Sequence, residues 1–312
     1  MSQTQSLWWQ DFVACPSCGS DAIQWPQHPN DTGRCEECGK FFKAKNNVLI
    51  WDKTKPLPQF NWGAFLFRVF RSCIHPPSSR FLPFYYWSQF RLNRYYKRIL
   101  TDIDLAKKWV HHYLKDFNLL EGATILDFGC GLGRVTAMLS LLGYRVMGVD
   151  LKMRSLWYEL SHAGFQEIEG SHVPCCDARF DLVVDYEVIH YLEESQLLDH
   201  ILEIRRVLKP GGYWMLLAVN SETYALREMR RQMGRVHELS KLQKLITDNG
   251  FVLMEQSFEG FYAPHFPMII NYIRKFLTFR QFNYFDYDSW IVKMTKPEKR
   301  GIILMRLKRA DQ

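Results

Sequence analysis

Four cysteines near the start of the chain are spaced as the ligands of one metal ion. They form the pairs Cys15-x2-Cys18 and Cys35-x2-Cys38, and 16 residues separate the two pairs, a spacing typical of four-thiolate zinc sites. A glycine follows each pair, in CPSCG and CEECG, where a tight turn favours a residue without a side chain. Four thiolates leave no open coordination position, so we expect a structural Zn2+ rather than a catalytic one.

A second group of residues suited to chemistry lies in the segment LDFGCGLGR, residues 126–134. Gly129, Gly131 and Gly133 follow a short apolar run that contains Asp127, and Asp150 ends the next apolar run, 23 residues after Asp127. A glycine-rich turn between a strand and a helix lets the backbone approach a nucleotide and directs helix N-terminal amides at it. A carboxylate at Asp150 can accept hydrogen bonds from both ribose hydroxyls of an adenosine.

The glycine spacing excludes NAD as the nucleotide. The NAD fingerprint G-x-G-x-x-G needs a third glycine for close helix packing. Counted from Gly129, that glycine would stand at Arg134, and counted from Gly131 it would stand at Thr136. The pattern therefore predicts another adenosine-containing cofactor.

Four segments together resemble the class I S-adenosylmethionine-dependent methyltransferases. They are ILDFGCGLGRVT, GVD at 148–150, FDLVVDYEVIHYL at 180–192 and LKPGGYWML at 208–216, and the resemblance covers about residues 105–308. It implies that S-adenosylmethionine is the cofactor and that Asp150 binds its ribose. It also implies that the methionine end is held by Asp127 and the loop, and the cofactor-binding residues are then Asp127, Gly129, Cys130, Gly131, Gly133, Asp150, Leu151, Ser171, His172 and Asp185.

The chain departs from the family pattern where the adenine amino group is bound. The family often has an Asp just after the third strand, but this chain has EGSHVP there, with Ser171 or His172 at the position. We therefore expect backbone groups to contribute more to adenine recognition.

Candidate catalytic residues follow the fourth expected strand, at the edge that in the resembling enzymes faces the methyl group. They are Asp185, Tyr186, Glu187 and His190. Methyl transfer from a sulfonium is an in-line displacement that mainly requires alignment and exclusion of water. By its intrinsic pKa, His190 is the best general base among them. The alternative, that His190 is a helix residue bonded to neighbouring backbone, stays open.

The pattern of the last two thirds predicts a doubly wound, Rossmann-like α/β fold with a seven-stranded, mostly parallel sheet. Lys209-Pro210-Gly211-Gly212 predicts a helix stop and turn before the fifth strand. The expected strands are Thr124–Asp127, Arg145–Asp150, Phe165–Glu169, Asp181–Asp185, Tyr213–Ala218, Phe251–Phe258 and Gly301–Leu307.

We expect three regions: a zinc ribbon at 1–52, an aromatic and basic helical linker or cap at 53–115, and the methyltransferase domain at 116–312 with an insert at 260–290. Between Lys53 and Thr101 there are nine Lys and Arg and no Asp or Glu. Three interpretations of that stretch stay open: RNA binding, contact with a membrane interface, or a cap over the active site.

The composition sets outer limits on function. The chain has 312 residues, a net charge of +7 and 15% aromatic residues, which favours anionic partners without selecting one. No apolar run is long enough for a signal peptide or a membrane span, so we expect a cytoplasmic protein, with peripheral membrane contact left open. The sequence specifies no oligomeric state.

Three hypotheses for function follow. The first is methyl transfer to a small molecule that is lipophilic or aromatic, since both additions to the domain are aromatic and apolar. The second is methylation of an RNA base, because a zinc ribbon before such a domain is similar to the bacterial ribosomal RNA guanine-N1 methyltransferases. The third is a non-catalytic scaffold, against which the intact glycine loop and Asp150 argue.

Overall fold

The computed structural model describes residues 8–26, 32–45, 48–51, 102–160, 163–220, 237–259 and 296–311. The aromatic and basic stretch 53–101 and the insert 260–290 lie outside these residues. Within the described residues, no helix is long and apolar enough to span a membrane.

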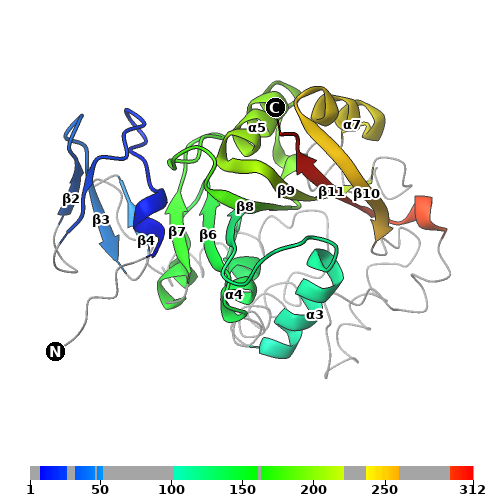
Figure 1. Cartoon of the computed structure of the whole chain (residues 1–312), viewed down its shortest axis with the longest axis horizontal. Coiled ribbons are helices and arrows are strands. Elements are labelled where there is room, and N and C mark those ends of the chain that lie inside the picture. Colours follow the sequence, from blue (N-terminus) through cyan, green and yellow to red (C-terminus); the bar gives the residue numbers. More distant parts are fainter. Residues whose placement is uncertain are drawn as a thin grey trace, which may run out of the picture.

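The strands form a single sheet of eleven, in the order β1-β2-β3-β4-β7-β6-β5-β8-β9-β11-β10 (Figure 1). All seven expected strands form, as β5 to β11, but the expected total of seven was wrong because four N-terminal strands extend the same sheet. The bounds are β1 Ile23–Gln24, β2 Thr32–Cys35, β3 Phe41–Lys45, β4 Val48–Ile50, β5 Thr124–Phe128, β6 Arg145–Asp150, β7 Gly164–Glu167, β8 Phe180–Tyr186, β9 Leu208–Val219, β10 Phe251–Glu259 and β11 Ile302–Arg309.

Strand direction divides the sheet into three parts. The central strands β7, β6, β5, β8 and β9 pair in parallel, as expected for strands connected through crossover helices. At one end β11 runs antiparallel between β9 and β10, and at the other β1 to β4 form an antiparallel meander. The prediction of a mostly parallel sheet therefore holds for the seven expected strands, of which five pair in parallel, while the N-terminal strands make the eleven-stranded sheet mixed.

Helices cover both faces of the central sheet, with α3 and α4 on one side and α5 and α7 on the other (Figure 1). Successive strand residues point to opposite faces, so Leu126 and Val183 pack with α5 and α7, while Ile125 and Val184 pack with α3 and α4. The helix bounds are α3 Ile103–Leu114, α4 Arg134–Leu141, α5 Glu194–Val207 and α7 Leu239–Asp248, and the short 3-10 helices are η1 Trp8–Phe12, η2 Ser155–Glu159, η3 Ile189–Tyr191 and η4 Pro297–Lys299.

The segment Lys209–Gly212 forms a bulge inside β9 rather than a turn before it. Leu208 pairs with Phe180 and Tyr213 pairs with Leu182, so four residues of β9 lie opposite Asp181 alone. Lys209 Nζ donates to Asp181 Oδ1 at 2.7 Å across this bulge. The helix stop was correctly placed, because α5 ends at Val207, but the chain enters the strand at once.

The N-terminal strands join the central sheet at β7. β4 pairs in parallel with β7 through Val48 with Phe165 and Leu49 with Gln166. Trp9 packs on the same edge, where a Cβ on Gly164 would lie 2.8 Å from its Cδ1. The four-cysteine region is therefore built onto the edge of the sheet.

Candidate cofactor and metal sites

The glycine loop connects the end of β5 to the start of α4, at the carboxyl edge of the parallel strands. Gly129, Gly131 and Gly133 have φ angles of +70°, +55° and +80°, a region that side chains disfavour. A Cβ on Gly129 would lie 2.3 Å from Val188 Cγ2, whereas a Cβ on Gly131 would meet nothing within 4 Å. The loop is thus tightly packed at its base and open at its middle, where a ligand can approach the backbone.

Asp127 turns back to the helix that follows the loop. Its Oδ2 accepts hydrogen bonds from the backbone N–H and the Oγ1 of Thr136, at 2.9 and 2.5 Å, in the first turn of α4. Burial raises the pKa of Asp127 to about 6, although the bonds from Thr136 act to lower it. The side chain expected at the methionine end of the cofactor thus serves here as a cap of α4, which positions the loop.

Asp150 ends β6 directly beside the loop. Its Oδ2 accepts from the Gly131 N–H at 2.9 Å and its Oδ1 from the Lys152 N–H at 3.0 Å. The next side chain, Leu151, is 62% exposed. This places a half-buried carboxylate and an exposed apolar side chain together, a combination suited to a ribose and the flat face of an adenine.

Cys130 contributes backbone rather than a thiol to the loop surface. Its N–H donates to the Val149 carbonyl at 2.9 Å, and its side chain is buried against Gly148, where a Cβ would lie 2.9 Å from Sγ. Burial raises the pKa of this thiol well above its ordinary value. The thiol is therefore held neutral beneath the loop.

Ser171 and His172 follow β7, the neighbour of β6. Glu167 at the end of β7 pairs with Asp150, and the chain then turns through Gly170, with a bridge between Glu169 and His172. His172 Nδ1 lies 3.2 Å from Glu203 Oε1 on α5. The structure therefore directs His172 toward α5.

Asp185 and Tyr186 end β8 and point to opposite faces of the sheet. Asp185 is fully buried, and its Oδ2 lies 2.8 Å from His200 Nε2 of α5. Tyr186 lies on the other face, where its ring centroid is 6.4 Å from that of Trp109. The guanidinium of Arg134, the first residue of α4, lies 5.9 Å from the Tyr186 ring centroid.

Glu187 and His190 occupy the turn after β8. Glu187 has a φ of +61°, and burial raises its pKa while the charge of Arg134 opposes that rise. His190 is 2% exposed, and neither of its ring nitrogens has a hydrogen-bond partner among the described residues. Burial lowers the pKa of His190 to about 4, so the imidazole is neutral at pH 7.

His200 is a site residue that the sequence analysis did not identify. It lies on the buried face of α5 with Leu197, Ile201 and Ile204. A histidine in line with apolar residues at helical spacing is a signal that could have found it. Its contact with Asp185 explains why a carboxylate is tolerated in the core at that position.

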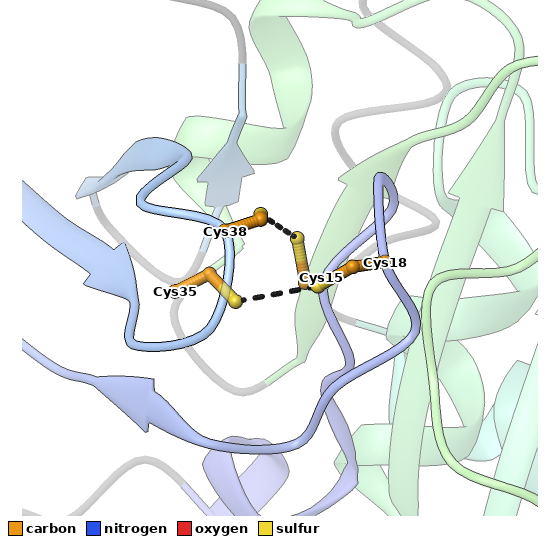
Figure 2. Close-up of side chains that lie close together, drawn as sticks. All are labelled: Cys15, Cys18, Cys35 and Cys38. Atoms are coloured by element: carbon orange, nitrogen blue, oxygen red, sulfur yellow. Dashed lines mark hydrogen bonds between the residues drawn. The ribbon is translucent and has the colours of Figure 1, made fainter.

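The four predicted metal ligands come together. Their sulfur atoms all lie within 4.8 Å of one another, with Cys15 Sγ 3.4 Å from Cys38 Sγ and Cys18 Sγ 3.5 Å from Cys35 Sγ (Figure 2). Separations of this size fit four thiolates about 2.3 Å from one central ion.

The two halves of the cysteine cluster have matching turns. The Gly19 N–H donates to the Cys15 carbonyl at 2.8 Å, and the Gly39 N–H donates to the Cys35 carbonyl at 3.0 Å. Cys15 and Cys35 are buried in a small core with Trp9 and Phe42, whereas Cys18 and Cys38 are exposed. Each turn thus contributes one buried and one exposed sulfur atom to the same cluster.

Comparison with known proteins identifies the part of the chain that holds the glycine loop. Residues 126–216, from β5 to β9, match the family model described as a methyltransferase domain. The chain therefore contains a methyltransferase domain over these residues. The glycine loop, Asp150 and the turn after β8 all lie inside the matched part of this methyltransferase domain.

Individual relatives of the methyltransferase domain share its sequence over part of their length. A mitochondrial ubiquinone biosynthesis O-methyltransferase of Dictyostelium discoideum is 30% identical over 120 residues, which are 32% of this chain and 36% of that protein. A ubiquinone biosynthesis O-methyltransferase of Bradyrhizobium sp. is 29% identical over 177 residues, 49% of this chain and 68% of that protein. The chain thus spans about a third of the first relative and two thirds of the second.

The methyltransferase domain is also similar to solved structures. Phosphoethanolamine N-methyltransferase 2 of Haemonchus contortus, in complex with S-adenosylmethionine, aligns with a TM-score of 0.46 and 20% identity, over 66% of this chain and 53% of that chain.

Proposed function

We propose that the chain transfers the methyl group of S-adenosylmethionine to a small lipophilic or aromatic molecule. The observation that carries the proposal is the pairing of an open, positive-φ glycine loop with the Asp150 carboxylate at the carboxyl edge of β5 and β6, inside the matched methyltransferase domain. Ligands of open α/β sheets bind at this edge.

The proposed cofactor lies along that edge. The backbone of Gly129–Gly133 receives its methionine end, with Asp127 keeping the loop in place from below, and Asp150 binds the ribose hydroxyls. Leu151 covers one face of the adenine, and Ser171 and His172 stand near its amino group. The departure from an Asp at that last position leaves the hydrogen bonds to adenine to Ser171 and backbone groups.

S-adenosylmethionine supplies an activated methyl group, which is displaced in line from its sulfonium by a nucleophile of the acceptor. If that nucleophile is a hydroxyl, its proton must leave, and a neutral imidazole can accept it. We propose His190 for the base role because its nitrogens lack partners among the described residues. Burial lowers its pKa to about 4, which makes it a weaker proton acceptor than a free imidazole. We propose Tyr186 and Glu187 as acceptor-positioning residues, and Asp185 as the support of this turn through His200.

An oxygen acceptor fits this chain best. The two relatives described above are named as O-methyltransferases of ubiquinone biosynthesis. Tyr186, which ends β8, is partly exposed, while its ring neighbours Trp109 and Tyr113 are buried in the core. The membrane alternative depends on the stretch 53–101, which lies outside the described residues, and the RNA alternative depends on that stretch together with the zinc ribbon and the net positive charge.

We further propose that the four cysteines bind one structural Zn2+ and that the chain divides near residues 52 and 115. The donor set offers four sulfurs and leaves no position for a substrate. A four-strand unit of this size has a small core of its own, so the metal would contribute to its folding free energy.

The proposed function is tested with methyl-labelled S-adenosylmethionine and a small-molecule extract of cells from which the gene for this chain has been deleted. We expect label to enter an organic-soluble product with the wild-type chain, and much more slowly with Asp150→Asn at cofactor concentrations that do not saturate the variant. Label in added ribosomal RNA would favour the second hypothesis. No label in either fraction, from a chain that binds the cofactor, would favour the scaffold hypothesis.

A further inference from the structure

The segment His172–Asp177 of the methyltransferase domain lies between the residues that lead into the four-cysteine cluster and helix α5. On one side it pairs with the residues that lead into the first cysteine. The Ala14 N–H donates to the Pro174 carbonyl at 3.1 Å, the Cys176 N–H donates to the Phe12 carbonyl at 3.0 Å, and Val13 forms an antiparallel bridge with Cys175. Cys15 follows Ala14 directly, so the first cysteine of the cluster is one residue away from this pairing.

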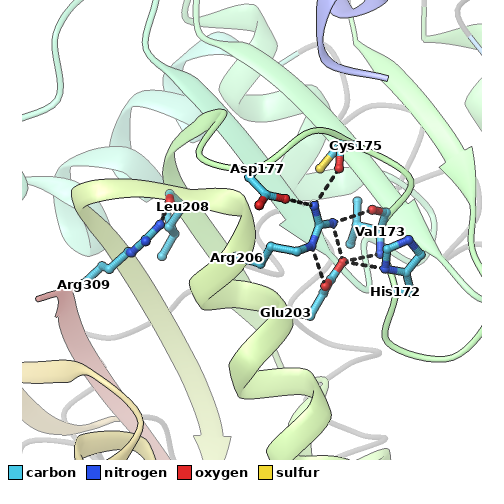
Figure 3. Close-up of polar contacts among 8 residues, drawn as sticks. All are labelled: His172, Val173, Cys175, Asp177, Glu203, Arg206, Leu208 and Arg309. Carbon is cyan, nitrogen blue, oxygen red and sulfur yellow. Dashed lines mark hydrogen bonds and ion pairs between the residues drawn. The ribbon is translucent and has the colours of Figure 1, made fainter. Parts of the chain in front are cut away.

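On the other side the same segment is held by α5 (Figure 3). Glu203 Oε1 accepts from the Val173 N–H at 2.6 Å. The Arg206 guanidinium donates to the Val173 carbonyl and to the Cys175 carbonyl, each at 2.8 Å. The backbone of the segment is therefore bound from two directions, by α5 and by residues 12–14.

The two charged residues of α5 are tied to each other and to the segment ends. Arg206 forms ion pairs with Asp177 at 2.6 Å and with Glu203 at 2.7 Å, and Glu203 also meets His172. Burial by itself raises the pKa of Glu203, but the bonds from Arg206 and the Val173 N–H hold it below its ordinary value. Glu203 therefore stays ionised at neutral pH and holds the start of the segment, while Arg206 holds its end at Asp177.

We propose that His172–Asp177 is a positioning element through which Arg206 and the metal-bound cysteines set the affinity for the adenine of the cofactor. The inference rests on the proposed function, in which Ser171 and backbone groups beside it bind the adenine amino group, while the His172 side chain contacts Glu203. Glu203 and Arg206 touch no part of that cofactor and are positioning residues.

The physical basis is the entropy of ordering the segment. A loop already fixed in its binding geometry costs less to order when a ligand binds. Loss of either support leaves the segment held from one side, so the cost of ordering it is added to cofactor binding. Loss of the second support then weakens cofactor binding by less than loss of the first did, because the segment is already free to move on one side.

The test measures two dissociation constants by calorimetry, one for S-adenosylhomocysteine and one for its inosine analogue, which lacks the adenine amino group. We expect Arg206→Met to weaken S-adenosylhomocysteine binding by about tenfold, within the usual range for coupled sites, and to move the ratio of the two constants toward one. Lys209→Met is the matched control, since its ion pair is with Asp181 outside the segment. Lys209→Met should bind as wild type.

The second arm removes the metal with a chelator, with zinc release followed colorimetrically. We expect the metal-free wild type to shift in the same direction as Arg206→Met, and the metal-free variant to shift by less than the product of the two effects. The proposal would be overturned if folded Arg206→Met showed the wild-type dissociation constants for both ligands and the same ratio between them. It would also be overturned if the effects of Arg206→Met and of metal removal on these constants simply multiplied.

A second variant covers the case in which Arg206→Met does not fold. Glu203→Gln keeps an acceptor for the Val173 N–H but removes the charge that holds Arg206, so we expect a smaller shift in the same direction. If Glu203→Gln left the ratio of the two dissociation constants unchanged, that result would count against the positioning role of the segment. If wild type itself binds neither ligand, the proposed function fails, and this inference fails with it.

Discussion

The Asp150 carboxylate accepts a hydrogen bond from the Gly131 N–H at 2.9 Å, while the Trp157 indole Nε1–H donates to the Gly131 carbonyl at 2.9 Å. The middle of the glycine loop is therefore tied to the end of β6 and to η2 through both of its backbone groups. Such fixing before a ligand arrives lowers the cost of binding it. It also makes Asp150 a residue whose loss should affect both the loop and the ribose contact.

Asp150→Asn should weaken S-adenosylhomocysteine binding by at least tenfold, about 1.4 kcal/mol. The amide presents one neutral acceptor where the carboxylate presents two charged ones. Calorimetry measures the change. Asp248→Asn, on the exposed face of α7, is the control, and equal affinities for the two variants would contradict the ribose assignment.

Gly129→Ala should destabilise the fold more than Gly131→Ala. Both residues have positive φ, which costs an alanine about 1 to 2 kcal/mol, but only at Gly129 would the new Cβ meet Val188, at 2.3 Å. Urea denaturation of the two variants gives the difference directly. Similar midpoints for the two would show that Val188 does not restrict the base of the loop.

The contribution of His190 to stability should fall in mild acid, while Asp127, whose pKa burial raises to about 6, acts in the opposite direction below pH 6. The folded pKa of His190, about 4, lies below the ordinary value of 6.5, so the unfolded chain binds the proton more readily. The contribution of His190 to stability is present above pH 6.5 and is lost as the pH falls toward 4, by up to about 3 kcal/mol. In His190→Gln, the free energy of unfolding should vary less over this range, and a slope unchanged from wild type would rule out a buried neutral imidazole.

Purified chain should contain about one zinc ion, and Cys18→Ser should lose most of it, since three thiolates bind the ion less completely. Metal analysis by mass spectrometry and the thermal midpoint give the two readouts, and both should fall together. Cys176→Ser changes a half-buried thiol outside the cluster and should retain the metal. Zinc retained by Cys18→Ser would refute a four-thiolate site.

The central strands could be predicted because each is a short apolar run bounded by turn residues. Such a run is expected where the side chains of a strand are buried on both faces of the sheet. Arg145–Asp150 matches its prediction fully, and the others shift by a few residues. The extension of the sheet by β1 to β4 could not be predicted, since the joining contact between β4 and β7 consists of two residue pairs. A contact that small leaves no periodic trace in the sequence.

The candidate sites were predictable to different degrees for a physical reason. The cysteine spacing specifies a cluster because one ion must join both turns, and the four sulfurs do meet. Side-chain direction is set by packing instead, so Asp185 turned out to be buried against His200 and His172 to face Glu203. The bulge at Lys209–Gly212 likewise depends on pairing with the neighbouring strand β8. The turn residues Pro210, Gly211 and Gly212 carry no information about that pairing.

The most direct test of the central claim is a calorimetric titration of the full chain with S-adenosylhomocysteine, repeated in the presence of excess NAD. We expect saturable binding at one site per chain, unaffected by NAD and weakened by Asp150→Asn. Absence of saturable binding, or displacement by NAD, would contradict the central claim.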